Sequence, residues 1–234
     1  MLQQLRKIFV GMVKDKGFQL ERKKSCGVSI SAVMANRIHR GAGKKGFGNA
    51  REVRNKIEEV IAQQSDRLGT MRLHMKPVSE RDYKMLLAVD SIGVRPDFSR
   101  SPIMRELEAM VGLKKVKEQF RNLMMMATQN FDREMRGEKP NFISLHRVFY
   151  GNPGTGKTTV SKMYGALLKE LGYLSNGDFI SVTPADLTGD HEGGASTATK
   201  AVLDKAKGKV LLIDEAYILD PKVLNLLALL VHKY

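Results

Sequence analysis

The hydrophobic residues in the first third of the chain recur every three or four positions. This spacing places them on one face of an α-helix, which is the face that packs into a core. Three segments have the pattern: Leu2, Leu5, Phe9, Met12 and Val13; Ile30, Val33, Met34 and Ile38; and, from about Asn49, Val53, Ile57, Val60, Ile61 and Leu68. Because glycine readily ends a helix, we expect Gly17, Gly41 and Gly69 to follow the three helices. The pattern therefore predicts a small helical bundle.

Residues 76–101 show no sustained period and are interrupted by Pro77, Gly93 and Pro96. Prolines and glycines at this density are typical of a connecting segment. We therefore expect a linker that contains one short helix starting at Ser79.

Two further helices are predicted after this linker. Ser101 followed by Pro102 is a typical helix start, because serine caps the first backbone N–H groups and proline fits the first turn. The first helix carries Ile103, Leu107, Met110 and Val111, and the second, after Gly112, carries Val116, Phe120, Leu123, Ala127 and Phe131. The run Met124–Met126 fits packing better than a cofactor or peptide-binding patch, because only part of it can face outward.

From His146 the pattern becomes an alternation of strands and helices. Val148–Tyr150, Phe179–Val182 and Val210–Ile213 are short apolar runs that predict strands. The helices between them carry Val160, Met163, Tyr164, Leu167, Leu168 and Leu171, and then Val202, Leu203 and Ala206. This alternation predicts an α/β fold with a parallel sheet, whose ligands bind at the carboxyl ends of the strands.

The composition limits the class of protein. Hydrophobic residues make up 42% and charged residues 27%, as in globular proteins, and no apolar run is long enough to cross a membrane. The first residues lack the apolar run of a secretory signal, and the early acids Asp15 and Glu21 argue against a mitochondrial presequence. Cys26 is the only cysteine, which excludes an internal disulfide and a cysteine-based zinc site. We expect an intracellular, reducing location such as the cytoplasm.

The formal net charge of +14 raises the question of an anionic partner. The basic excess lies mainly before residue 75, without interleaved aromatic residues or a nucleic-acid-binding motif. A solvated helical face that also neutralises nucleotide phosphates or a partner is favoured over specific nucleic-acid binding.

The turn after the first strand carries the clearest chemical motif. Gly151–Thr158 fits the P-loop pattern G-x-x-x-x-G-K-[ST] at every position. Glycines let successive N–H groups point at phosphates, and the following helix adds its positive N-terminal end. The residues expected to contact ATP are Gly151, Asn152, Pro153, Gly154, Thr155, Gly156, Lys157, Thr158 and Thr159. Lys157 is expected to neutralise the β and γ phosphates, and the Thr158 hydroxyl to bind Mg²⁺.

Two adjacent carboxylates follow the last predicted strand. Asp214 is expected to hold Mg²⁺, directly or through water, and Glu215 to orient and deprotonate the attacking water. A second carboxylate serves hydrolysis rather than simple binding, so an ATPase is favoured over a small-molecule kinase. The alternative is an acidic surface pair without catalytic work.

Three stretches together resemble an AAA+ ATPase of the CbxX/CfqX branch, which includes red-type rubisco activases and sporulation-protein-like ATPases. They are GNPGTGKTT, the run from DFISVTPADL through KVLLIDEAYIL, and ELEAMVGLKKVKEQ, within residues 102–220. The resemblance implies a P-loop NTPase sheet, the AAA+ large subdomain. It also implies ATP-driven remodelling of a protein partner by AAA+ modules assembled in a ring.

A further stretch, KGFGNAREVRN, is similar to the start of the sensor 2 helix in the α-helical lid of AAA+ proteins. The resemblance puts the sensor 2 arginine at Arg51; otherwise Arg51 and Arg54 are exposed helix charges. It implies an unusual order: a lid of a preceding module over 1–75, a linker over 76–101, and a partial ATPase large subdomain over 102–234. We therefore expect an internal piece of a tandem AAA+ protein that lacks sensor 1, the arginine finger and the second lid, and hydrolyses ATP slowly by itself.

The loop after the second strand departs from the family pattern. Its aromatic pore position is occupied by His191, between Asp190 and Glu192. Adjacent residues rarely converge on one metal ion, so a solvent-facing loop is favoured over both a pore loop and a metal site. A nucleotide-binding interaction module with little hydrolysis remains the alternative to an ATPase for the chain as a whole.

Overall fold

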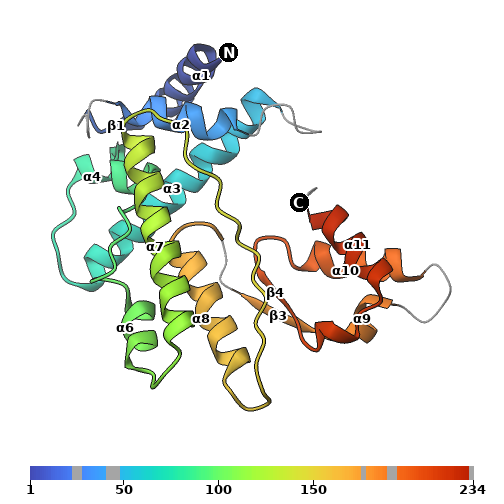
Figure 1. Cartoon of the computed structure of the whole chain (residues 1–234). Coiled ribbons are helices and arrows are strands. Elements are labelled where there is room, and N and C mark those ends of the chain that lie inside the picture. Colours follow the sequence, from blue (N-terminus) through green and yellow to red (C-terminus); the bar gives the residue numbers. More distant parts are fainter. Residues whose placement is uncertain (23–27, 41–47, 175–177, 189–193, 232–234) are drawn as a thin grey trace. The chain divides into compact units, whose positions relative to one another are not determined.

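The computed structural model describes residues 1–22, 28–40, 48–174, 178–188 and 194–231 (Figure 1). Two compact units divide the chain. The first unit comprises Met1–Pro96 and Met125–Ile143, and the second comprises Asp97–Met124 and Ser144–Tyr234. Helix α7 (Lys114–Met135) contributes residues to both units.

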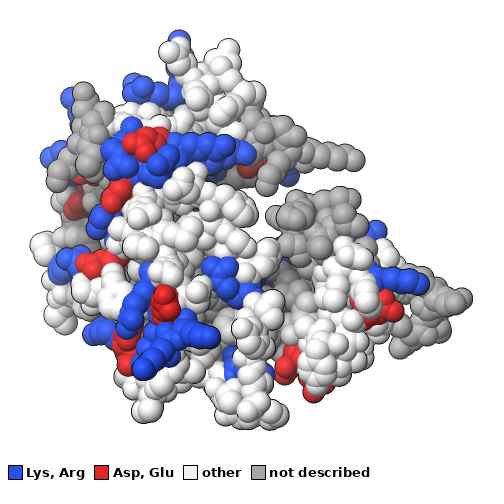
Figure 2. Space-filling view, viewed as in Figure 1, with Lys and Arg blue, Asp and Glu red and all other residues white. Residues whose placement is uncertain are grey.

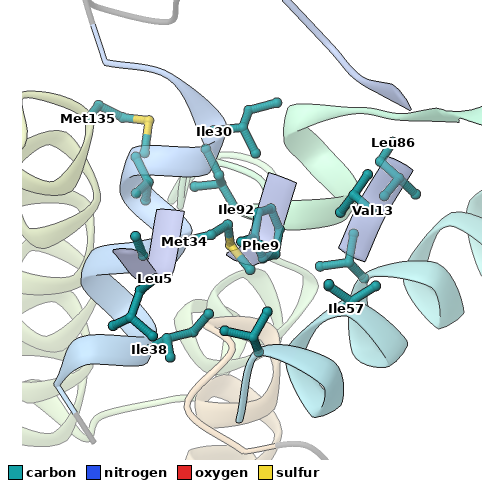
Figure 3. Packing of buried hydrophobic residues seen from close by; sticks show 14 residues of the cluster. Leu5, Phe9, Val13, Ile30, Met34, Ile38, Ile57, Leu86, Ile92 and Met135 are labelled. Atoms are coloured by element: carbon teal, nitrogen blue, oxygen red, sulfur yellow. The ribbon is translucent and has the colours of Figure 1, made fainter. Parts of the chain in front are cut away.

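The first unit is helical. Its elements are α1 (Leu2–Asp15), β1 (Gln19–Leu20), α2 (Ile30–His39), α3 (Asn49–Leu73), α4 (Glu80–Lys84), β2 (Met85–Leu86) and α5 (Ala88–Ser91), with the C-terminal part of α7. The three helical faces predicted from the sequence form one core, in which Phe9, Met34 and Ile57 are fully buried (Figure 3). The predicted three-helix bundle is therefore confirmed for the part of the chain that the structure describes.

The third helix is longer than predicted. Gly69 lies inside α3, and the helix continues to Leu73. The chain leaves it at Met75, which has a left-handed φ of 53°. Glycine inside a helix costs only about 1 kcal/mol relative to alanine, so residues on both sides can carry the helix through it.

Residues 76–101, expected to form a linker, contribute to the same core. Leu86 and Ile92 are buried with α1, α2 and α3, and β2 pairs in parallel with β1. The short helix expected from Ser79 is present, capped by the Ser79 hydroxyl, which accepts a hydrogen bond from the Asp82 N–H. The burial of Leu86 and Ile92 ties the part of the segment around them to the helices that precede it.

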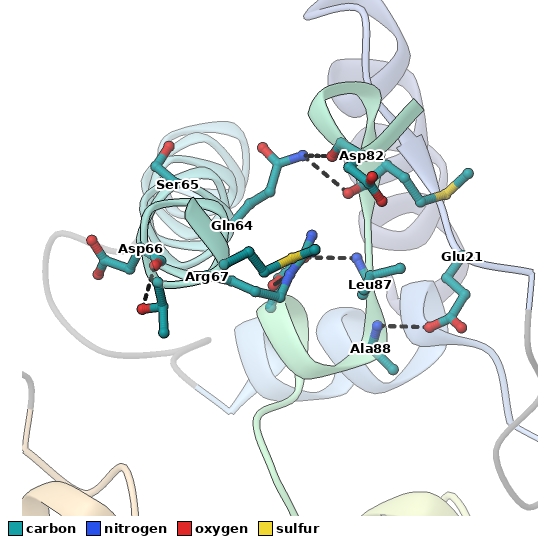
Figure 4. Close-up of polar contacts among 12 residues, drawn as sticks. Glu21, Gln64, Ser65, Asp66, Arg67, Asp82, Leu87 and Ala88 are labelled. Carbon is teal, nitrogen blue, oxygen red and sulfur yellow. Dashed lines mark hydrogen bonds and ion pairs between the residues drawn. The ribbon is translucent and has the colours of Figure 1, made fainter. Parts of the chain in front are cut away.

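Polar side chains also fix residues 80–91 on α3 (Figure 4). The buried Gln64 amide donates to the carbonyls of Asp82, Tyr83 and Met85 at 2.9–3.1 Å. Arg67 forms a two-pronged ion pair with Asp90, at 2.7 and 3.0 Å. Buried polar groups of this kind stabilise a fold only when their partners are present.

The second unit contains α6 (Pro102–Ala109), the N-terminal part of α7, α8 (Lys157–Glu170), β3 (Phe179–Val182), α9 (Pro184–Thr188), α10 (Gly194–Lys205), β4 (Val210–Ile213), a 3₁₀ turn (Ala216–Ile218) and α11 (Pro221–Val231). The predicted cap of α6 is confirmed, because the Ser101 hydroxyl accepts from the Met104 N–H at 3.1 Å. Helix α6 ends at Ala109, so Met110 and Val111, expected on it, lie beyond its end.

Strands β3 and β4 run parallel and in register, from Phe179 beside Val210 to Val182 beside Ile213. Val148–Tyr150, expected to be the strand that precedes the loop, is not a strand in the structure. An extended segment becomes a strand only when a neighbour pairs with its backbone, and no strand among the described residues does so. The parallel α/β arrangement is thus confirmed for two strands.

The surface charge of the described residues is mixed. On the face in Figure 2, acidic side chains lie among the basic ones. Ion pairs such as Arg95–Asp132 and Lys209–Asp178 neutralise part of the basic excess.

None of the described helices is long and apolar enough to cross a membrane.

Candidate nucleotide site

The loop before α8 has the backbone that its glycines allow. Gly154 and Gly156 adopt left-handed φ values of 76° and 85°, which side chains other than glycine rarely accept. Helix α8 begins directly after Gly156, whose carbonyl accepts from the Val160 N–H at 3.0 Å. The first N–H groups of α8 have no partner within the helix, and this is the arrangement that binds phosphate at helix N-termini.

Lys157 folds back over this loop. Its ammonium donates to the carbonyls of Gly151 and Asn152, each at 3.0 Å. The Thr155 hydroxyl donates to the same Asn152 carbonyl at 2.8 Å, and a Cβ at residue 151 would approach that hydroxyl to 3.1 Å. The lysine charge is therefore held against the backbone at the start of the loop.

Helix α8 is seated on the sheet by a close contact. A Cβ at Gly165 would lie 2.6 Å from the Cγ2 atom of Val210, the first residue of β4. Only glycine lets the helix axis come this near to the strand. On the same helix Val160, Met163 and Leu167 are buried, and the Lys162 ammonium lies 5.8 Å from the centre of the Phe179 ring. The sheet thus fixes the helix that carries the loop.

The two carboxylates of the site end β4. The Asp214 N–H donates to the Val182 carbonyl at 2.9 Å, which continues the ladder with β3, and the Asp214 carboxylate accepts from the Glu215 N–H at 3.0 Å. Glu215 has a left-handed φ of 51°, a conformation that costs about 1–2 kcal/mol for a residue with a side chain. Strain of this size at a strand end is frequent in functional sites. Both side chains are exposed.

Thr183 and Asp186 were missed by the sequence reasoning. Asp186 accepts from the Thr183 N–H and hydroxyl, at 2.7 and 2.8 Å, and these hydrogen bonds lower the pKa of Asp186. Thr183 and Asp214 directly follow the last paired residues of β3 and β4, Val182 and Ile213, so both come at the carboxyl edge of the sheet. The signal was present in the sequence, since Thr-Pro-x-Asp is a capping pattern at a helix start.

The structure groups the expected site residues in two sets. Gly151–Thr159 form one loop and the first turn of α8, and Asp214 and Glu215 lie at the end of β4. All belong to the second unit. Among these described residues, no hydrogen bond or ion pair joins the two sets. Thr158 is exposed on the first turn of α8.

Other expected features lie elsewhere. Arg51 is exposed near the start of α3 in the first unit. Asp190, His191 and Glu192 lie outside the described residues. The described ranges contain no group of three His, Cys, Asp or Glu side chains that could hold a metal ion by itself. A hydroxyl and a carboxylate are ligands that Mg²⁺ accepts together with nucleotide phosphates, so Thr158 and Asp214 suit it chemically.

Two family models match the chain. Residues 2–101 match the AAA lid domain, and residues 147–226 match the ATPase family associated with various cellular activities (AAA). The lid match extends through residues 76–101, of which Leu86 and Ile92 are buried with the helices before them.

Several curated proteins are similar to parts of the chain. Protein CbxX of Cupriavidus necator is 44% identical over 110 residues, which are 47% of this chain and 35% of that protein. Stage V sporulation protein K of Bacillus subtilis is 38% identical over 115 residues, 49% of this chain and 36% of that protein. A chloroplastic ribulose bisphosphate carboxylase/oxygenase activase of Cyanidioschyzon merolae is 36% identical over 133 residues, 55% of this chain and 45% of that protein. The chain spans less than half the length of these relatives.

Proposed function

We propose that this chain, which belongs to the AAA+ ATPases of the CbxX branch, binds ATP with Mg²⁺ in Gly151–Thr159 and hydrolyses it with the help of Asp214 and Glu215. The observation that carries the proposal is the loop geometry. Gly154 and Gly156 have left-handed φ values, and Lys157 holds its charge against the carbonyls of Gly151 and Asn152.

The residues have separate roles in this proposal. The loop N–H groups and the N-terminal end of α8 bind the phosphates, and Lys157 exchanges its carbonyl partners for phosphate oxygens. Thr158 and Asp214 hold Mg²⁺, which when bound offsets the negative charge that develops on the phosphates. Glu215 orients a water molecule and accepts its proton.

The wider function follows from the family. An AAA ATPase domain together with an AAA lid supports a nucleotide cycle that drives remodelling of a protein partner by modules arranged in a ring. One of the relatives is named as an activase of a carboxylase, and such a protein substrate is a model for the kind of partner to seek. We further propose that the lid includes residues 76–101, because Leu86 and Ile92 pack in its core.

Substitution of Lys157 by alanine tests the binding site. The change removes the cation from the loop, and we expect ATP affinity of the full chain to fall by more than about 100-fold, because charge-assisted contacts to phosphate are among the strongest that a loop makes. Binding of a fluorescent ATP analogue is measured by titration. Lys169→Ala, an exposed lysine in the last turn of the same helix, is the matched control and should keep the parent's affinity.

Two outcomes would count against Gly151–Thr159 as the ATP-binding site. Equal affinity of the parent chain and Lys157→Ala would contradict the assignment of the loop. An equal loss in Lys169→Ala would show that general charge, rather than the loop, attracts the nucleotide. Tight binding by a parent chain that does not turn ATP over would instead favour a nucleotide-binding interaction module.

A further inference from the structure

The segment 145–150 leads into the loop and, within the described part of the chain, belongs to no helix or strand. Its side chains differ in exposure. Leu145 and Phe149 are half-buried, whereas Val148 and Tyr150 are 87% and 91% exposed. Some side chains of the segment therefore pack on the protein.

Tyr164 of α8 makes contacts with this segment. Its hydroxyl donates to the Leu145 carbonyl at 2.8 Å, and its ring meets the Phe149 ring edge to face, with centroids 6.2 Å apart. The Arg147 guanidinium lies 5.7 Å from the centre of the same ring. Tyr164 thus contacts three alternate residues of one segment.

The other side of Tyr164 is anchored in the core of the second unit. Its ring packs edge to face on Phe120 of α7, with centroids 5.6 Å apart, and the residue is 5% exposed. Burial raises the pKa of the Tyr164 hydroxyl, so it stays protonated and remains a donor across the neutral range. The tyrosine is a fixed point against which the segment is held.

The contacts of Tyr164 join the two segments that flank the loop. The segment 145–150 enters the loop at one end and α8 leaves it at the other, so a contact between them sets the separation of the loop ends. We propose that Tyr164 is a positioning residue of the nucleotide site, holding Leu145–Phe149 against α8 and thereby fixing the shape of Gly151–Gly156. The inference rests on the proposed function of that loop.

Lys157 also links the loop to α8, through the carbonyls of Gly151 and Asn152. Those hydrogen bonds use the same ammonium that is proposed to bind phosphate, so they weaken when the site is used. The Tyr164 contacts involve no group proposed to bind the nucleotide. We therefore expect them to persist when ATP binds, which distinguishes a positioning residue from a ligand.

Two substitutions separate the contributions of Tyr164. Tyr164→Phe keeps the ring contacts and removes the hydrogen bond, and Tyr164→Leu removes both. We expect the affinity for a fluorescent ATP analogue to fall about five-fold in Tyr164→Phe, the value of one hydrogen bond, and ten-fold or more in Tyr164→Leu. In the nucleotide-free chain, hydrogen exchange of the backbone amides in 145–156 should become faster in both variants.

Leu187→Ala is the matched control. Leu187 is fully buried in the same unit, in the cluster around β3, β4 and α11, and that cluster as described includes no residue of 145–150. Its truncation should lower the unfolding temperature at least as much as Tyr164→Phe, yet leave ATP affinity and exchange in 145–156 unchanged. A purely structural effect of Tyr164 predicts instead that affinity follows stability in all three variants.

Failure of the Tyr164 inference can be distinguished from failure of the proposed function. Parent-like affinity and parent-like exchange in Tyr164→Phe and Tyr164→Leu would overturn the inference, even if Lys157→Ala still abolished binding. If Tyr164→Leu does not fold, Tyr164→Phe decides the matter alone. If the parent chain does not bind ATP, the proposed function fails, whereas faster exchange of 145–156 in Tyr164→Phe would still support the anchoring.

Discussion

The two units of this protein use polar residues in opposite ways. In the first unit, charged and amide side chains are buried and paired, as in Arg67–Asp90 and the contacts of Gln64. In the second unit, the residues proposed to act on the nucleotide are exposed or half-buried, and Lys157 and Asp214 bond to nearby backbone rather than to a distant charge. Paired, buried charges specify a fold, and accessible charges can meet a ligand.

The difference between the units predicts whether a substitution changes stability or nucleotide affinity. A change in a buried pair of the first unit should lower stability and leave nucleotide affinity alone. A change in the loop of the second unit should lower affinity and leave stability nearly unchanged. Substitutions at buried residues of the first unit can therefore break that division.

Arg67→Leu should destabilise the first unit by about 3–5 kcal/mol, because it leaves the Asp90 carboxylate buried without its partner. The measurement is urea unfolding followed by circular dichroism. Arg54→Leu, at an exposed position of the same helix, should change the free energy of unfolding by no more than about 0.5 kcal/mol. Nucleotide affinity of folded Arg67→Leu should match the parent, and a loss there would break the division between the units.

Leu86→Ala should destabilise the first unit by about 3 kcal/mol, because Leu86 is fully buried among the helices. This substitution tests whether 76–101 is part of the lid. Val94→Ala, in the same segment but 68% exposed, is the control and should have little effect. A Leu86→Ala chain as stable as the parent would return the segment to the role of a linker.

Glu134→Gln should cost about 2 kcal/mol at neutral pH, since the carboxylate accepts hydrogen bonds from Arg37 and Arg40. Burial alone would raise the pKa of Glu134, but the two arginines outweigh burial and lower it below the usual glutamate value. A lowered pKa in the folded state gives stability that is complete above the unfolded-state pKa and is lost as pH falls through the folded-state pKa.

The pH dependence provides the measurement for Glu134. Unfolding free energy of the parent should fall as the solution is acidified below the ordinary carboxyl pKa of about 4, and the slope should be smaller in Glu134→Gln. Glu58→Gln, an exposed carboxylate of α3, should keep the parent's slope. Identical slopes in Glu134→Gln and the parent would show that Glu134 does not couple folding to protonation.

The helices of the first unit could be predicted from the sequence, because their apolar residues recur every three or four positions. Phe9, Met34 and Ile57 lie where the three- and four-residue spacing placed them. The burial of Leu86 and Ile92 did not follow, because they have no periodic neighbours and their burial depends on contacts with distant residues. Local pattern also could not reveal that Gly69 remains helical, since that outcome depends on the residues around it.

The site followed from the sequence more directly than the sheet did. Gly154 and Gly156 have the positive φ values that the motif requires, and β4 ends at Ile213, directly before Asp214, as expected. Val148–Tyr150 has the composition of a strand, but a strand also needs a partner, and composition does not supply one. The hydrogen bond of Tyr164 joins residues 19 positions apart and could not be inferred from spacing.

Hydrolysis of ATP with Glu215 as the base can be tested by measuring ATP turnover of the full chain beside that of Glu215→Gln. The amide keeps the shape of the side chain but cannot accept the water's proton, so we predict unchanged ATP affinity and turnover lowered by about 100-fold or more. Asp204→Asn, an exposed carboxylate of the same unit, should turn ATP over like the parent. Turnover by Glu215→Gln at the parent's rate would contradict the role of Glu215 as the base. No turnover by the parent itself would contradict ATP hydrolysis by this chain.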